Sequence, residues 1–250
     1  MKIDTIAARS VDPATPIVPQ VYSLLREAII RGDLAPGNRI SESEIARSCD
    51  VSRQPVREAF IRLAAEGLLA VRPQRGTIVT KIDYAAVLDA RFLREAIEAD
   101  IAKILARESD PAVVAELTRQ LNAQRTAEDA QAFIRLDERF HRTLADAAGK
   151  QGAWKLIDGL KSQMDRVRFL SLDRFRVETL IAQHAAVVER IAASDTAGAN
   201  EAIRLHLRGI LSDLPQIEAA NPLFFDRPDG ELPRPVNAPI QSTPKGGETQ

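Results

Sequence analysis

The stretch that decides the fold of the N-terminal part is VSRQPVREAFIRLAAEGL, residues 51–68. After Ser52, the apolar residues Val56, Phe60 and Leu63 recur at the spacing of one face of an α-helix. A serine before the first helical residue is a common start signal, and a glycine after the last one is a common stop signal. The stretch therefore predicts one amphipathic helix, with its apolar face on a core and its arginines on the other face.

The residues on both sides of this helix predict the rest of a compact unit. An apolar repeat over residues 21–29 predicts a first helix, and Ser41 with Glu44 has the capping-box spacing that starts a second one. Residues 68–79 are expected to form two short strands, with a glycine placed for the turn between them. Helix, helix, turn, helix and β-ribbon is the order of a winged helix-turn-helix.

Positive charge gathers on this unit, although the whole chain has a formal net charge of -1. Arg53, Gln54 and Arg57 lie on the first turns of the third helix, where side chains can reach base edges in the major groove. Further arginines and the wing backbone are expected to hold phosphates. The alternative, a solvated helix face, does not account for the surrounding helix-turn-helix pattern. The predicted DNA-contacting residues are Arg39, Ser43, Ser52, Arg53, Gln54, Arg57, Arg72, Arg75 and Gly76.

The remaining chain predicts a mainly α protein with a second, all-helical domain. Residues 84–214 have few glycines and a helical apolar period, which is typical of an antiparallel helical bundle. Asp110 and Pro111 form a start signal within it. The expected helices span roughly residues 84–108, 111–126, 129–148, 152–170, 174–193 and 196–214.

The flanking segments differ from these two blocks in composition. We expect a flexible start over residues 1–16, the winged domain over residues 17–80, and a disordered, proline-rich tail over residues 221–250 in which Phe224 and Phe225 dock locally. A single cysteine excludes a disulfide framework. Because no long apolar run or signal-peptide block is present, we expect a cytoplasmic protein with no membrane partner.

All three histidines, His141, His184 and His206, fall in the predicted bundle near apolar stripes. His184 and His206 each lie about 11 residues from the loop between the last two helices, so an antiparallel hairpin with a rise of about 1.5 Å per residue brings them to the same height. Asp137 and His141 have i, i+4 spacing, which places them on one helix face. One carboxylate and three imidazoles suit a divalent metal ion, with zinc or nickel favoured. The alternative for each histidine alone is a hydrogen-bonded core residue.

Two segments resemble a known family of bacterial regulators. Residues 51–68, with the Pro36-Gly37 turn before them and a wing glycine after them, resemble the GntR superfamily over about 60 residues. The DERFH run from Asp137, with His184 and His206, resembles the ligand-binding FCD domain of FadR-type members over about residues 84–214. The resemblance implies that Asp137, His141, His184 and His206 hold a metal ion whose shell an effector carboxylate completes.

The resemblance also implies an effector-binding residue, and the chain departs from the family pattern at a few positions. Arg94, in the run LREAIE, is expected to pair with a small organic-acid effector, the alternative being an ion pair within the chain. Ser43 stands where many relatives have an arginine, which puts one DNA contact in doubt. Gln183 stands where glutamate is common and changes a hydrogen bond behind the metal ligands.

These features together predict a ligand-responsive transcriptional regulator, not an enzyme. We expect a homodimer that binds a palindromic double-stranded DNA operator. The resemblance to the family suggests that it acts as a repressor. One alternative is a metal-dependent hydrolase that activates water at the same Asp/His3 site, although no spare inward Glu or His is evident as a general base. Another is a direct sensor for which the metal ion itself is the effector.

Overall fold

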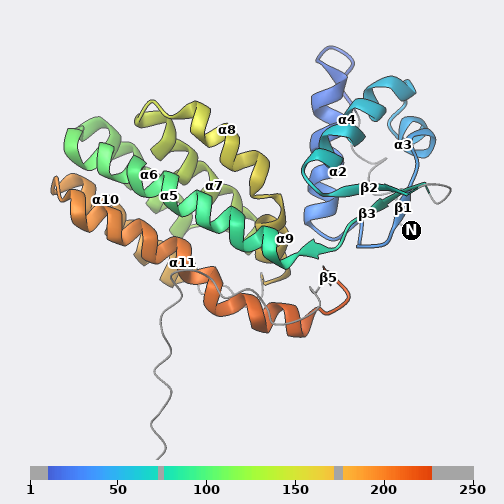
Figure 1. Ribbon diagram of the computed structural model, residues 1–250. Helices are drawn as coiled ribbons and strands as arrows, with labels where there is room; N and C mark the ends of the chain where they lie inside the picture. Colours follow the sequence, from blue (N-terminus) through green and yellow to red (C-terminus); the bar gives the residue numbers. More distant parts are fainter. Residues whose placement is uncertain (1–10, 73–75, 172–176, 227–250) are drawn as a thin grey trace, which may run out of the picture.

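The computed structural model describes residues 11–72, 76–171 and 177–226, and it has a winged domain on one side and an all-helical domain on the other (Figure 1). Most of the expected flexible start and of the expected tail lie outside the described residues. Within the described ranges, no helix is long and apolar enough to cross a membrane.

The winged domain has the predicted order of elements, except that residues 39–40 form an additional short strand between the first two helices. Ser41 Oγ accepts a hydrogen bond from the Glu44 backbone N–H at 3.1 Å, as expected of a helix start at this position. Gly67 follows the third helix with a φ of 70°, which glycine adopts without strain. Its helices are α2 (Ile17–Ile30), α3 (Glu42–Ser48) and α4 (Arg53–Ala65). Its antiparallel sheet has the order β1-β3-β2, with β1 (Arg39–Ile40), β2 (Leu69–Arg72) and β3 (Gly76–Val79).

The second domain is the predicted helical bundle. Asp110 caps a helix that has Pro111 in its first turn, and its side chain accepts from the Ala112 backbone N–H at 2.8 Å. A core of aliphatic and aromatic side chains, including Phe140 and Trp154, fills the space between the helices. The helices are α5 (Tyr84–Glu108), α6 (Pro111–Arg125), α7 (Ala130–Ala147), α8 (Gln151–Leu160), α9 (Ser162–Leu170), α10 (Val177–Ala192) and α11 (Thr196–Ala220).

The helix expected over residues 152–170 is in fact two helices, because the chain turns at Lys161 between α8 and α9. Lys161 is buried, and its ammonium lies 2.7 Å from Asp165 Oδ2 and 3.6 Å from Asp158 Oδ1. The apolar period runs through this point without interruption, so periodicity alone could not reveal the break. The separate α9 has a different direction from α8 (Figure 1).

The chain beyond residue 214 also differs from the expectation. The last helix continues through Pro215 to Ala220, because the burial of Leu214 and Ile217 offsets the backbone hydrogen bond that proline cannot donate. Residues 221–226 do not belong to a disordered tail. Among them, β5 (Phe225–Asp226) pairs in parallel with β4 (Ile82–Asp83) in the segment that joins the two domains.

A separate apolar cluster stabilises this junction between the domains. Ile82, Val87, Met164, Leu214 and Phe225 are buried members of it, from elements far apart in the sequence. The local docking expected for the two phenylalanines is thus confirmed for Phe225, which is 2% exposed.

We expect Phe225→Ala to lower the free energy of unfolding by about 3–5 kcal/mol, because it removes a buried aromatic ring from the junction. Leu223→Ala is the matched control, since Leu223 is 80% exposed and exposed substitutions change stability by about 0.5 kcal/mol or less. Urea unfolding followed by circular dichroism measures both. Equal stability of the two variants would show that the segment after α11 does not dock.

Candidate metal centre and nucleic-acid interface

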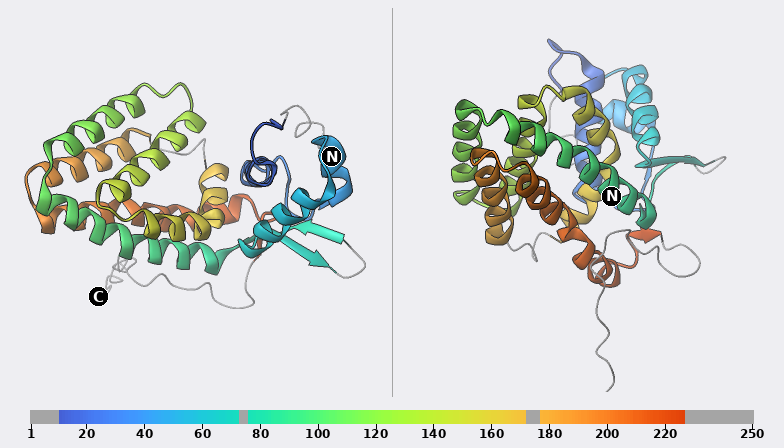
Figure 2. Two further views of the ribbon diagram at one scale, coloured as in Figure 1. Left: turned by 90° about the horizontal axis from the view of Figure 1, so that it is seen from above. Right: turned by 60° about the vertical axis from the view of Figure 1, so that its left-hand side comes forward.

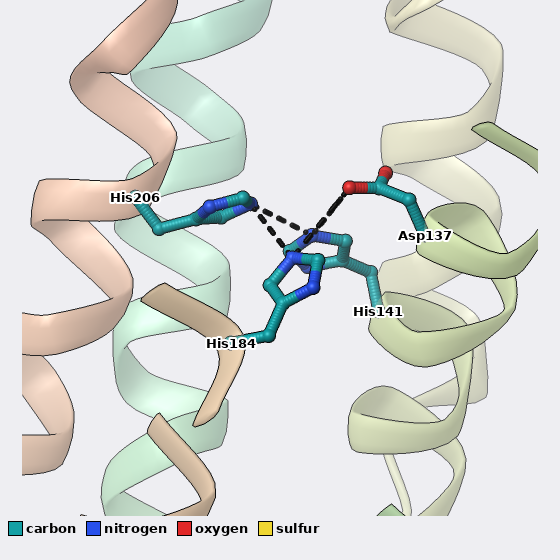
Figure 3. A group of neighbouring side chains, drawn as sticks. All are labelled: Asp137, His141, His184 and His206. Atoms are coloured by element: carbon teal, nitrogen blue, oxygen red, sulfur yellow. Dashed lines mark hydrogen bonds and ion pairs between the residues drawn. The ribbon is translucent and has the colours of Figure 1, made fainter. Parts of the chain in front are cut away.

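The structure brings the four predicted metal ligands together in the centre of the bundle (Figure 3). Asp137 and His141 come from α7, His184 from α10 and His206 from α11, and all four are buried. His206 Nε2 lies 3.1 Å from the Nε2 atoms of both His141 and His184. Asp137 Oδ1 lies 3.5 Å from His184 Nε2 and 4.0 Å from His141 Nε2. Four ligand atoms around one zinc ion, each at about 2 Å from it, would be spaced on the order of 3–3.5 Å.

The outer nitrogen of each imidazole has an oxygen acceptor as its partner. These partners are Glu98 Oε2 for His141 at 2.5 Å, Gln124 Oε1 for His184 at 2.9 Å, and Gln183 Oε1 for His206 at 3.1 Å. Each Nδ1 therefore carries the proton and donates it. Since a neutral imidazole has only one N–H, each Nε2 presents a lone pair to the centre of the site. Such outer partners fix the ring orientation of metal-binding histidines.

Two of the three histidines are held in the neutral form that a metal ligand requires. Burial lowers the pKa of His184 to about 3 and holds the pKa of His206 well below its usual range. Three imidazole lone pairs and one carboxylate oxygen then converge with no proton between them. These acceptor atoms repel one another unless a cation lies between them. The residues present therefore fit a divalent metal ion.

The fourth ligand, Asp137, is oriented by an arginine that the sequence analysis did not single out. Arg168 Nη2 donates to Asp137 Oδ2 at 2.6 Å, whereas Asp137 Oδ1 is buried without a hydrogen-bond partner among the described residues. Burial alone would raise the pKa of Asp137, but the Arg168 charge holds it well below its usual range. One oxygen of an ionised carboxylate is thus fixed, and the other could bind a cation.

Arg94 forms the intramolecular ion pair that the sequence left open as an alternative, and it also lines the pocket described below. Its Nε donates to Glu98 Oε1 at 2.5 Å. Burial would raise the pKa of Glu98, but Arg94 and His141 lower it to about 2. Glu98 is therefore a buried carboxylate beside the site that the sequence analysis did not single out. Glu98 is inward, but its two oxygens are engaged by Arg94 and His141, so it is not a free general base.

A pocket of about 500 Å³ lies directly beside the metal site. His206, Arg94 and Arg168 line it, while Ser171 and Gln183 add polar groups and Met164 adds an apolar one. Small-molecule sites in proteins are typically about 300–1,000 Å³. The pocket can therefore place a metabolite in contact with a metal ligand and two guanidinium groups.

The described DNA-contacting candidates lie at the start of α4, on α3 and on the adjoining sheet. Arg53, Gln54 and Arg57 are exposed on the first turns of α4. Ser52 is the N-cap residue of α4, but its side chain makes no capping hydrogen bond. The other described members are exposed as well, namely Arg39, Ser43, Ser52, Arg72 and Gly76. The predicted Arg75 lies outside the described residues.

The contacts of Arg53 are weak enough for DNA to replace them. Its Nη2 lies 3.3 Å from Glu42 Oε2, but 69% of the Arg53 side chain is exposed. Ion pairs with this exposure contribute about 0–1 kcal/mol. The guanidinium is therefore available to a base edge or a phosphate.

Comparisons with known proteins agree with this arrangement. Residues 18–79 match the bacterial regulatory proteins of the gntR family, and residues 89–209 match the FCD domain. Among solved structures, E. coli McbR/YncC shares the fold with a TM-score of 0.68 and 20% identity, covering 81% of this chain and 98% of its own. A GntR transcriptional regulator from Rhodococcus sp. RHA1 has a TM-score of 0.64 and 26% identity over 81% of this chain and 98% of its own.

Two curated relatives are more similar in sequence. The HTH-type transcriptional repressor RspR of Escherichia coli (strain K12) is 38% identical over 86% of this chain and 96% of its own length. An uncharacterized HTH-type transcriptional regulator in an unstable DNA locus of Streptomyces ambofaciens is 40% identical over 82% of this chain and 88% of its own. The chain therefore belongs to the GntR family of bacterial transcriptional regulators, in the group whose second domain is an FCD domain.

Proposed function

We propose that this regulator binds a palindromic operator and changes its affinity for that operator when a small carboxylate metabolite binds beside a divalent metal ion in the FCD domain. The observation that carries the proposal is the convergence of three imidazole lone pairs with an unpartnered carboxylate oxygen at the edge of a pocket. Asp137, His141, His184 and His206 would hold the ion. Bound there, a zinc or nickel ion supplies a positive charge and open coordination positions to a ligand in the pocket.

The charges around the site favour an acidic effector. The carboxylates of Asp137 and Glu98 cancel the guanidiniums of Arg94 and Arg168, all of which are close to the site. The charge of a bound divalent ion would therefore remain uncompensated in a buried place, which is costly. A metabolite carboxylate in the pocket would compensate it, with Arg94 as the chain's own contact.

Operator binding is proposed to use two copies of the chain, acting in the cytoplasm where the chromosome lies. A palindromic site has two half-sites related by a two-fold axis, which a symmetric homodimer matches. Repression is the proposed direction, supported by the relative that is named a repressor. The effector changes operator affinity only if it binds two arrangements of the dimer with different affinity.

The metal site is tested by inductively coupled plasma mass spectrometry of protein loaded with zinc or nickel. Wild type is expected to hold near one ion per chain, whereas Asp137→Asn, His184→Ala and His206→Ala are expected to lose it. Asp146→Asn is the matched control, because Asp146 is an exposed carboxylate on the same helix. A wild-type protein that stays free of metal after loading would refute the metal-dependent part of the proposal and leave the DNA-binding part intact.

The DNA interface is tested by fluorescence anisotropy on an operator selected from random duplex DNA. Arg53→Ala and Arg57→Ala are each expected to weaken binding by about 1–3 kcal/mol, the typical cost of losing a specific arginine contact. Arg62→Ala is the matched control, since Arg62 is exposed in the last turn of the same helix. An equal loss in all three variants would indicate charge attraction without base reading.

The same assay, together with a hydrolysis assay, separates the proposal from its alternatives. Zinc-loaded protein is titrated with a panel of sugar acids, hydroxy acids and dicarboxylates. Operator affinity that follows zinc alone, with no response to any acid, would favour a direct metal sensor. Turnover of ester or amide substrates by zinc-loaded protein would favour a hydrolase.

A further inference from the structure

The short helix α9 lies at the boundary between the two domains, beside both the bundle and the winged domain (Figures 1 and 2). Its first turns contact the winged domain through polar side chains. Ser162 Oγ donates to Glu66 Oε2 at 2.5 Å, and Gln163 Nε2 donates to the Gly67 carbonyl at 3.1 Å. Glu66 is the C-cap residue of the DNA-reading helix α4, so α9 holds the end of that helix.

Arg26 of the winged domain strengthens this contact by bridging the two domains. Its Nε lies 3.2 Å from Glu66 Oε2 in its own domain, and its Nη2 lies 3.1 Å from Asp165 Oδ2 on α9. The three side chains are only 12–17% exposed, so solvent screens them less than it screens a surface pair. Burial would raise the pKa of Asp165, but Lys161 and Arg26 hold it below its usual range. Asp165 is therefore an ionised partner of the winged domain.

The other end of α9 belongs to the metal site. Arg168 lies one turn after Asp165 on the same helix, and it donates to the metal-ligand candidate Asp137. Met164, Arg168 and Ser171 all line the pocket beside His206. A helix of nine residues thus contacts the DNA-reading domain with its first turns and the metal and effector site with its last turns.

One contact between α9 and the winged domain contains a buried positive charge that has no opposite charge beside it among the described residues. Arg166 is 2% exposed and donates to the Thr80 carbonyl at 2.8 Å and to Gln163 Oε1 at 3.3 Å. Among the described residues it has no carboxylate partner, and burial lowers its pKa to about 10. A buried cation held only by neutral acceptors stabilises an interface weakly. The Arg166 contact therefore adds little to the stability of the interface between α9 and the winged domain.

We propose that α9 transmits the state of the metal and effector site to the DNA-reading helix, with Arg168 as the positioning residue at one end and Ser162 and Asp165 as the contacts at the other. This inference rests on the proposed function. A cation beside Asp137 Oδ1 competes with Arg168 for the charge of one carboxylate, and an acid in the pocket adds a second anion beside Arg168. Both would change how strongly Arg168 is held at Asp137. Because α9 is one short packed helix, a shift at this end would also move its other end.

The test uses the full chain and zinc alone, with hydrogen–deuterium exchange as the readout. In wild type, zinc is expected to change the exchange rates of the Glu66, Gly67, Leu68 and Thr80 amides, whose hydrogen bonds lie at the α9 contact. The expected change is about twofold to thirtyfold, which corresponds to typical coupling energies of about 0.5–2 kcal/mol. Ser162→Ala and Asp165→Asn are expected to bind zinc at the same stoichiometry and to lose this change.

Asp158→Asn is the matched control, because Asp158 also faces Lys161 but forms no hydrogen bond or ion pair with the winged domain among the described residues. It is expected to keep the wild-type response. Compared at the zinc occupancy of wild type, Arg168→Gln is expected to lose the response, and Arg168→Lys to restore part of it. Circular dichroism identifies any variant that fails to fold, and Ser162→Ala, which removes one hydroxyl, tests the contact if Asp165→Asn does not fold.

Three results would overturn the inference. Bound zinc with no change at these amides in wild type would refute transmission through α9 while leaving the metal site established. An unchanged response in both Ser162→Ala and Asp165→Asn would do the same. Failure of wild type to bind zinc would refute the proposed metal-dependent function together with this inference.

Discussion

The bundle is arranged around one electrostatic constraint, which is that four buried acceptor atoms point at the same small volume. Such an arrangement is unfavourable by itself, because lone pairs and a carboxylate repel one another in a medium of low polarity. It persists here because α5, α6 and α10 supply a hydrogen-bond partner for the far side of every imidazole. The packing of those helices therefore fixes the orientation of each ring before any ion is bound.

The same constraint explains why so many charged groups are buried nearby. Glu98 orients His141, and Arg94 then neutralises Glu98. Arg168 neutralises Asp137 in the same way. Behind each ligand lies a charged side chain or an amide. The neighbouring charges therefore balance in pairs, and only a bound cation would change the net charge of the site. Under the proposed function, a small anion in the adjoining pocket would compensate the charge of that cation.

The sequence predicted the parts of this site that repeat with a regular period and missed the parts that depend on tertiary contacts. His184 and His206 could be placed at one height because both lie equally far from one hairpin loop, and the i, i+4 spacing joined Asp137 to His141. The winged domain was predictable because its caps, turns and apolar repeat are all local signals. Arg168 gave no such signal, since its partner Asp137 is 31 residues away in the chain. The break at Lys161 and the continuation past Pro215 likewise follow from buried contacts, which override local propensity.

The parallel pairing of β4 with β5 has a mechanical consequence for the whole molecule. A single extended linker permits rotation about its own axis as well as bending in two directions. Here the linker is hydrogen-bonded along its side to the chain that returns from α11, and Phe224 lies near Gly32 of the winged domain. Rotation about the linker axis would break the hydrogen bonds between these two paired strands. The winged domain is therefore joined to the helical domain by two paired segments of the chain, which restrain its rotation.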